Sequence, residues 1–312
     1  MKKKLTLLFA AVILSAAAVA AQEMNADPAK AQIVTSDIEL FWKAYDKATP
    51  ANDLIVYRDE YLKKGSPGLQ AFTALRIGSV CRLVDTISAR PKYYAALRAS
   101  SLKVAGYEPR MRESFRKLKE IYPDAEFPNV YFVVGAMNSG GTLTGKGLLI
   151  GVEMYGKTDA TDVSELSNWH KAVLNPIEKI PLIVAHELIH YQQRYEMGND
   201  TTLLGKAIQE GSADFIGELI SGGTINEHLF KFGDPIEKQL WLEFKKEMNG
   251  TDVSNWLYQG DKAVGRPADL GYYIGYKITR SYYENATDKK QAIRDILNIK
   301  DFGKFLEASK YE

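Results

Sequence analysis

One β-rich stretch, "NVYFVVGAMNSGGTLTGKGLLIGVEMYG" at 129–156, limits the sheet that this chain can build. Its β-branched and aromatic residues predict two strands, near 129–135 and 147–155, joined by a turn at Gly140-Gly141. Elsewhere, apolar residues recur at the three- and four-residue spacing of helices. The sequence therefore predicts a mainly α fold of the α+β class, with a small, mostly antiparallel sheet.

Helical patterns flank this stretch on both sides, and glycine and proline separate them. Ser36, with Glu39 three residues later, has the spacing of a capping box and predicts a helix start. Other helices are expected at 52–65, 66–89, 90–105, 110–123, from about 181, and near 202–221, 234–248, 268–285, 288–297 and 301–309. The chain then divides into an N-terminal helical region, a core and a C-terminal helical lobe, at 22–128, 129–221 and 222–312.

Residues 1–21 have the layout of a secretory signal peptide. Lys2, Lys3 and Lys4 precede an apolar run at 5–14, and small residues follow it. A membrane anchor is the alternative, but the run is short for a span and ends in small residues. No cysteine follows it, so we expect no lipoprotein anchor. We expect an exported protein, periplasmic or secreted, with no membrane span in the mature chain.

Charge and cysteine content narrow the possible partners. The formal net charge is +1, and removal of the three leader lysines leaves −2. No basic run stands out, so no nucleic-acid partner is expected. Cys81 is the only cysteine, which excludes an intramolecular disulfide and a cysteine zinc site. Its place in the apolar helical pattern "RIGSVCRLVDTI" predicts a buried core residue.

The stretch "PLIVAHELIHYQQRYE" at 181–196 holds two of the chain's 4 histidines. His186 and His190 lie four residues apart on a strongly helical segment, which places both imidazoles on one face. Such a pair reaches a shared tetrahedral metal, and Glu187 beside them is suited to take a proton from a metal-bound water. Two histidines alone do not bind zinc tightly, so a third ligand decides the type of site.

Two arrangements supply a third ligand. A histidine six residues after His190 is one of them, but Glu196 occupies that position and Gln193 replaces the expected glycine. The other is a glutamate on the following helix, and "AIQEGSADFIGELI" supplies Glu210. Asp214 lies four residues further on the same helical face.

The residues that follow Glu210 suggest two further features of the site. Asp214 fits an acceptor that fixes the tautomer and orientation of a ligand histidine, His186. The small residues at 211–213 are expected to let this helix pack closely against the motif helix.

The paired pattern His186-Glu187-x-x-His190 and Glu210-x-x-x-Asp214 resembles that of the gluzincin metallopeptidases, the thermolysin-like zinc proteases. The resemblance implies a zincin-like fold, with a catalytic core at 129–221 and one Zn²⁺ on His186, His190 and Glu210. It implies Glu187 as general base and later proton donor. It also implies a cleft between the part with the sheet and motif helix and the C-terminal lobe.

A second resemblance covers most of the mature chain. "NSGGT", "GLLIGVEMYG", "AHELIHYQQ", "EGSADF" and "GYYIGYKI" resemble a bacterial family of predicted zinc-dependent proteases. Members of that family are exported, their function is unknown, and some are related to gliding-motility lipoproteins. This resemblance implies an exported zinc protease without naming its substrate.

The remaining expectations concern substrate binding. Zinc proteases hold extended peptides on an edge strand, and the segment at 148–155, with Gly151 and Glu153, is the candidate. A structural edge strand without a ligand is the alternative. Gluzincin relatives stabilise the oxyanion with a tyrosine or histidine of the C-terminal lobe. Tyr272 and Tyr276, beside glycines in "LGYYIGYKI", are the candidates, and His228 is the alternative.

Three other polar residues are less suited to the site. His170 is expected on the surface or in a loop. Arg266 and Arg280 are suited to clamp a substrate carboxylate, but a solvated or salt-bridged arginine is the stronger interpretation.

The sequence therefore predicts an exported zinc metallopeptidase that hydrolyses peptide bonds of peptide or protein substrates. The alternative is an exported binding or assembly factor that keeps the fold with a structural zinc. Glu187 favours the enzyme, because a structural site needs no base beside its water.

Overall fold

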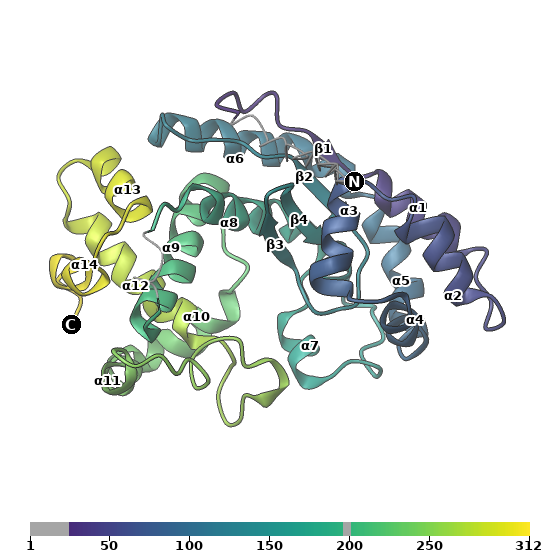
Figure 1. Cartoon of the computed structure of the whole chain (residues 1–312). Coiled ribbons are helices and arrows are strands. Elements are labelled where there is room, and N and C mark those ends of the chain that lie inside the picture. The colour runs from purple at the N-terminus through teal and green to yellow at the C-terminus, as the bar shows by residue number, and fades with distance from the viewer. Residues whose placement is uncertain (1–24, 196–200) are drawn as a thin grey trace, which may run out of the picture.

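A computed structural model describes residues 25–195 and 201–312. The predicted signal peptide at 1–21 lies outside these residues. Figure 1 shows most of the N-terminal helices on one side of a small central sheet and the C-terminal helices on the other. The prediction of a mainly α fold with a small sheet is confirmed. Among the described residues, no helix is both long and apolar enough to cross a membrane.

The sheet has four strands in the order β1-β2-β4-β3. Their bounds are Ile33–Val34 (β1), Val130–Val133 (β2), Gly141–Thr144 (β3) and Gly147–Gly151 (β4). β2 pairs in parallel with both β1 and β4, and β3 pairs antiparallel with β4. The expectation of a mostly antiparallel sheet is therefore wrong.

The position of one turn explains this difference. The tight turn of the hairpin lies at 145–146, before Gly147, whose φ is +133°. Gly141, expected in a turn, begins β3 instead. β3 therefore occupies the edge of the sheet and β4 lies inside it, so the prediction of an edge strand at 148–155 is wrong.

Short helices cover the N-terminal side of the sheet. They are α1 (Ser36–Tyr45), α2 (Asp53–Val56), η1 (Tyr57–Leu62), α3 (Pro67–Phe72), η2 (Thr73–Ile77), α4 (Val80–Ser88) and α5 (Pro91–Ser101). After η3 (Val104–Tyr107), α6 (Glu108–Ile121) packs instead against α8 (Ile180–Gln192) and α9 (Leu203–Ser221). The expected helix at 66–89 is broken at Gly78, whose φ of +79° lies in the left-handed region.

Two local predictions in this region are wrong. Ser36 is the first residue of α1, after Thr35, and no side chain caps the helix, so the capping box does not form. Cys81 is exposed. α4 buries Leu83, Val84 and Ile87, and Cys81 lies on the opposite face of this short helix.

The C-terminal side is built around two long helices, α9 (Leu203–Ser221) and α12 (Leu270–Asn285). The other helical elements that follow the sheet in the chain are η4 (Val152–Tyr155), α7 (Asn168–Val173), η5 (Ile177–Lys179), α8 (Ile180–Gln192), α10 (Glu227–Gly233), η6 (Asp234–Ile236), α11 (Glu237–Glu247), η7 (Gly260–Lys262), α13 (Lys289–Leu297) and α14 (Phe302–Ser309). α9 lies between α8 and α12 and packs against both.

Glycines on opposite faces of α9 allow these contacts. A Cβ on Gly217 would lie 3.3 Å from the backbone nitrogen of His186 on α8. Gly211 faces α12 instead, where a Cβ would lie 2.0 Å from the backbone nitrogen of Tyr276. The expectation that the small residue at 211 packs on the motif helix is therefore wrong. That contact belongs to Gly217.

Candidate metal centre

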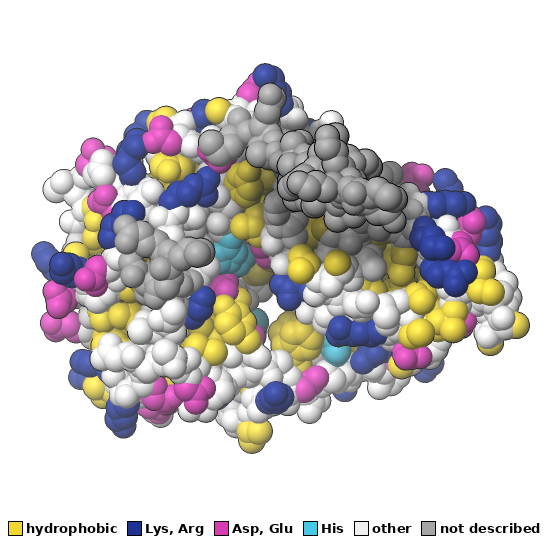
Figure 2. Space-filling model, viewed as in Figure 1, with side chains coloured by type: hydrophobic (Ala, Val, Ile, Leu, Met, Phe, Trp, Pro, Cys, Tyr) yellow, Lys and Arg dark blue, Asp and Glu magenta, His cyan; other side chains and the backbone are white. Residues whose placement is uncertain are grey.

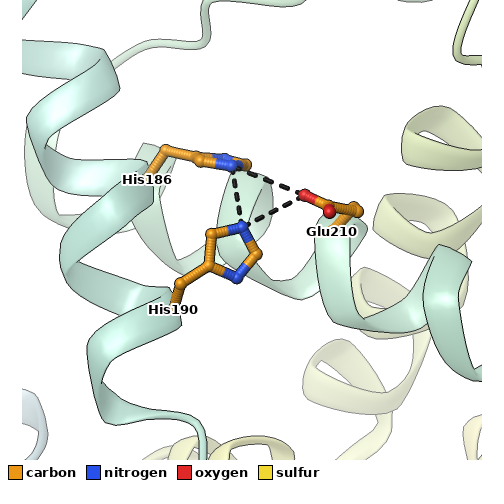
Figure 3. A group of neighbouring side chains, drawn as sticks. All are labelled: His186, His190 and Glu210. Carbon is orange, nitrogen blue, oxygen red and sulfur yellow. Dashed lines mark hydrogen bonds and ion pairs between the residues drawn. The ribbon is translucent and has the colours of Figure 1, made fainter. Parts of the chain in front are cut away.

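Three predicted ligands meet between α8 and α9. Nε2 of His190 lies 3.0 Å from Nε2 of His186 and 3.1 Å from Oε2 of Glu210. Nε2 of His186 lies 3.7 Å from the same oxygen. Figure 3 shows both rings and the carboxylate pointing toward one another. Two ligand atoms about 2.0–2.1 Å from a tetrahedral zinc ion stand roughly 3.3 Å apart, so these distances fit a shared cation.

The outer nitrogen of each imidazole is held by a second side chain. Nδ1 of His186 donates to Oδ1 of Asp214 at 2.8 Å, and Nδ1 of His190 donates to Oε1 of Gln193 at 2.9 Å. The amide group of Gln193 donates to the carbonyl oxygen of Gln209, which fixes the direction of the amide. These bonds leave the lone pair on each Nε2 for a metal.

This set of donor atoms suits a metal cation. With both Nδ1 atoms donating, two neutral nitrogens and one carboxylate oxygen direct lone pairs at one point. The ligand side chains are nearly buried, with 6%, 14% and 11% of His186, His190 and Glu210 exposed. Buried lone pairs repel one another unless a proton or a metal cation lies between them. Two imidazoles and a carboxylate are the ligands of a catalytic zinc site with an open fourth position.

The histidines and carboxylates at the centre shift the pKa values of one another. Burial disfavours the charged form of His186, but hydrogen bonds to the carboxylates of Asp214 and Glu210 outweigh it and raise its pKa well above the ordinary value. Burial also opposes the carboxylate of Glu210, yet the neighbouring histidines hold its pKa well below its usual range. The centre therefore favours a positive charge beside Glu210.

Glu187 lies under the edge strand. Its side chain is on α8, and an ideal Cβ on Gly141 of β3 would lie 2.3 Å from its Oε1. Only glycine leaves room for the carboxylate at this crossing. Burial raises the pKa of Glu187, and the two histidines offset part of this rise. A raised carboxyl pKa suits a group that takes and returns a proton near neutral pH.

A cleft of about 720 Å³ opens beside the three ligands. Figure 2 shows a hollow between the two halves of the molecule, with histidine, acidic and basic side chains at its walls. Glu187, His190 and Glu210 line it, together with β3. Its walls also include apolar side chains, namely Met154, Val173, Ile183 and Ile225. The cleft therefore offers room for a chain of residues beside the centre.

The two tyrosines predicted on α12 separate in the structure. Tyr272 lines the cleft, and its ring lies 6.2 Å from that of His186 between centroids. The hydroxyl of Tyr272 makes no hydrogen bond within residues 25–195 and 201–312. Tyr276 is 5% exposed, does not line the cleft and donates to Glu218 at 2.6 Å. The expectation that Tyr276 acts at the centre is therefore wrong.

The predicted substrate-binding pair, Gly151 and Glu153, is buried. Gly151 ends the interior strand β4, and Glu153 has no exposed surface. The carboxylate of Glu153 accepts hydrogen bonds from the backbone N–H groups of Gly135 and Met137. It holds the loop that leads to β3 and does not line the cleft. β3 takes the edge position expected for β4.

The other candidates lie as follows. His170 is 7% exposed, and its ring bonds to the carbonyl of Met137, so the expected surface position is wrong. His228 lines the cleft, and burial lowers its pKa. Arg266 and Arg280 pair with Glu243 and Glu284, as the salt-bridged alternative predicts.

Several side chains at the centre were not predicted from the sequence. Tyr258 donates to Oε1 of Glu210 at 2.7 Å. Arg76 lines the cleft from the N-terminal half. Gln193, noted only as a departure from another zinc motif, holds His190. Helical spacing places Gln193 beside His190 and is a usable signal, whereas Tyr258 and Arg76 come from distant segments that no local pattern links to the motif.

The fold and the centre define a protein with a candidate metal site beside an open cleft. A family model described as Predicted Zn-dependent protease (DUF2268) matches residues 110–301. The match covers more than half of the chain and includes every predicted ligand, and the chain belongs to this family. No curated protein and no solved structure gives a significant match.

Proposed function

We propose that this protein is a zinc metallopeptidase of the gluzincin type, with His186, His190 and Glu210 as the ligands of one Zn²⁺. The observation that carries the proposal is the meeting of three lone pairs beside Glu187 in an open cleft. When bound, the ion lowers the pKa of its water to about 7 and polarises a carbonyl group. Family membership supports peptides as the substrate class.

Glu187 acts as the base in this proposal. Its carboxylate takes the proton from the attacking water and returns it to the leaving amine. Its place under β3 supports this role, because a peptide on the strand would lie over the carboxylate. Asp214 and Gln193 keep the imidazoles oriented during the cycle.

β3 is the proposed substrate strand. It pairs with β4 on one side only. Gly140 accepts a hydrogen bond from the N–H of Gly151, so by the alternation of antiparallel pairs the backbone groups of Gly141 and Leu143 face away from β4. An extended peptide on that side adds a strand through its main chain. The predicted edge-strand role thus transfers from β4 to β3.

Tyr272 is the proposed oxyanion donor. Its hydroxyl is without a partner in the described parts of the chain, and it lines the cleft beside His186. A donor in such a position stabilises charge that develops on the attacked carbonyl. His228 is the second candidate, since its ring also lines the cleft.

The leader sequence supports export to the periplasm or beyond the cell. The family match gives no location, so this part of the proposal rests on residues 1–21.

Glu187→Gln tests the proposal. The variant keeps all three ligands, so metal analysis should still find one zinc per chain. Its kcat/KM for peptide hydrolysis should fall by about 10²–10⁴, the usual contribution of a general base. Glu120→Gln, on the exposed face of α6, is the matched control and should retain activity. Unchanged hydrolysis in Glu187→Gln contradicts the enzyme, and an inactive wild type with bound zinc favours the binding factor.

A further inference from the structure

One arginine of the cleft, Arg76, forms no ion pair with a carboxylate of the described residues. Arg76 belongs to η2, a π-helix that ends at Gly78, and π-helical turns often occur at functional sites. Its backbone carbonyl accepts from Nδ2 of Asn138 at 2.9 Å and from the guanidinium of Arg82 at 3.2 Å. These bonds fix the backbone from which the side chain of Arg76 reaches the cleft.

The guanidinium of Arg76 is poorly satisfied. Nη2 donates to Oγ1 of Thr142 on β3 at 2.6 Å. Nε is buried without an acceptor, and no carboxylate within residues 25–195 and 201–312 forms an ion pair with Arg76. An arginine presents its donors in a planar fork that matches a carboxylate. Nη1 makes no hydrogen bond within the described residues, so the cleft holds a positive charge with free Nη1 donors that suit a carboxylate of a ligand.

The contact with Thr142 places this charge close to the proposed reaction. Thr142 directly follows Gly141, the residue that Glu187 approaches from below. Successive residues of a strand advance by about 3.3 Å. A peptide on the free edge of β3 therefore brings a group one or two residues from its scissile bond next to Arg76.

We propose that Arg76 is a specificity-determining residue that binds a carboxylate of the substrate within two residues of the scissile bond. The inference rests on the proposed peptidase function. An acidic side chain and the C-terminal carboxylate of a short peptide offer the same chemistry. The second source makes the protein an exopeptidase, and the first makes it an endopeptidase with an acidic preference.

Hydrolysis of matched peptides tests the assignment. The substrates are pools of hexapeptides in matched pairs. In some pairs the members differ by Glu or Gln at one position, and in others by a free carboxylate or an amide at the C-terminus. Wild type should cleave one carboxylate-bearing pool at least about 10-fold faster in kcat/KM, the effect of charge-assisted hydrogen bonds. Arg76→Gln should abolish this preference, so that carboxylate-bearing and neutral pools are cleaved with equal kcat/KM. Arg76→Lys should restore part of it, because the charge remains but the fork is lost.

Two outcomes overturn the proposal. Equal cleavage of all pools by wild type removes the preference, and an equal loss on all pools in Arg76→Gln shows that the residue only supports β3. Arg116→Gln, on the far face of α6 and paired with Glu113, is the matched control and should behave as wild type. Cleavage without preference refutes the inference and leaves the peptidase function standing.

A binding measurement tests the role of Arg76 without peptide hydrolysis. Zinc-loaded Glu187→Gln is titrated with the same pools by calorimetry. A carboxylate-bearing pool should bind about 10-fold more tightly than its neutral match, and the double variant with Arg76→Gln should bind both equally. If wild type cleaves nothing, the peptidase function fails while this comparison still tests Arg76. Equal affinities in the Arg76-containing protein refute the carboxylate site.

Discussion

At the scale of single residues, the centre depends on acceptors behind the histidines. Asp214 uses both oxygens, one for Nδ1–H of His186 and one for the amide of Asn226 at 2.7 Å. Each bond needs an oxygen acceptor, and a carboxylate supplies two. The orientation of the His186 ring, and with it the direction of the Nε2 lone pair, therefore depends on a side chain with two acceptor oxygens at position 214.

Asp214→Asn should weaken metal binding more than its small size change implies. One acceptor oxygen cannot serve both donors, so either His186 or Asn226 loses its partner. We expect zinc affinity to fall by about 10–100-fold, as for other outer partners of ligand histidines. Competition with a coloured chelator measures the change. Asp85→Asn, on the exposed surface of α4, is the control, and equal affinities in both variants contradict the role of Asp214.

The buried carboxyl group of Glu153 should make the free energy of unfolding depend on pH. Burial raises its pKa to about 7, and hydrogen bonds from Gly135 and Met137 offset only part of the rise. In the unfolded chain the carboxyl group has its ordinary pKa of 4.5. Between pH 4.5 and 7 the unfolded chain has therefore lost a proton that the folded protein keeps, and each pH unit lowers the free energy of unfolding by about 1.4 kcal/mol. From pH 4.5 to 7, the free energy of unfolding of wild type should fall by about 2.5 kcal/mol relative to Glu153→Gln. Urea denaturation at several pH values measures this difference, and parallel curves contradict it.

At the scale of elements, the crossing of α9 and α12 sets the position of Glu210 relative to Tyr272. A Cβ on Gly275 of α12 would lie 1.7 Å from the carbonyl oxygen of Ala207 on α9. Glu210 and Tyr272 lie within one turn of this crossing, on α9 and α12 respectively. The approach of two backbones, rather than a large side chain, therefore sets the distance between ligand and tyrosine.

Gly275→Ala should separate these helices. Overpacking of this kind costs about 1–3 kcal/mol, and the shift should also reduce peptide hydrolysis because Tyr272 moves with α12. Chemical denaturation and kcat/KM report the two effects. Gly106→Ala is the control, since its added Cβ meets nothing within 4 Å. A Gly275→Ala protein as stable and active as this control would show that the crossing tolerates a side chain.

The elements also show what the sequence could predict. The long helices follow from periodicity, and the His186–His190 pair follows from spacing within one helix. The strand β3 was missed because its glycine-rich sequence resembles a turn, although glycine is needed where Glu187 lies beneath Gly141. The parallel pairing of β2 with β4 and the contact of Tyr258 with Glu210 were not predictable, because both join segments that only the tertiary fold brings together.

At the scale of the whole molecule, the centre joins two packing systems. α8 packs against β3 and β4 of the sheet and against α9, and α9 packs in turn against α12 of the C-terminal side. The histidines belong to the first helix and Glu210 to the second. A cation bound by all three ties the sheet side to the C-terminal side, next to the cleft that lies between them.

Removal of metal should therefore destabilise the whole chain and not only the centre. A ligand that binds the folded state alone contributes RT ln(1 + [L]/Kd), about 4 kcal/mol at a free concentration 1,000 times Kd. Calorimetry should show a melting temperature that falls on dialysis against a chelator and returns with added Zn²⁺. Glu210→Ala leaves two ligands, so its melting temperature should respond little to zinc. A full response in Glu210→Ala would mean that the two histidines bind the ion without α9, and the coupling of the two sides through the metal would be refuted.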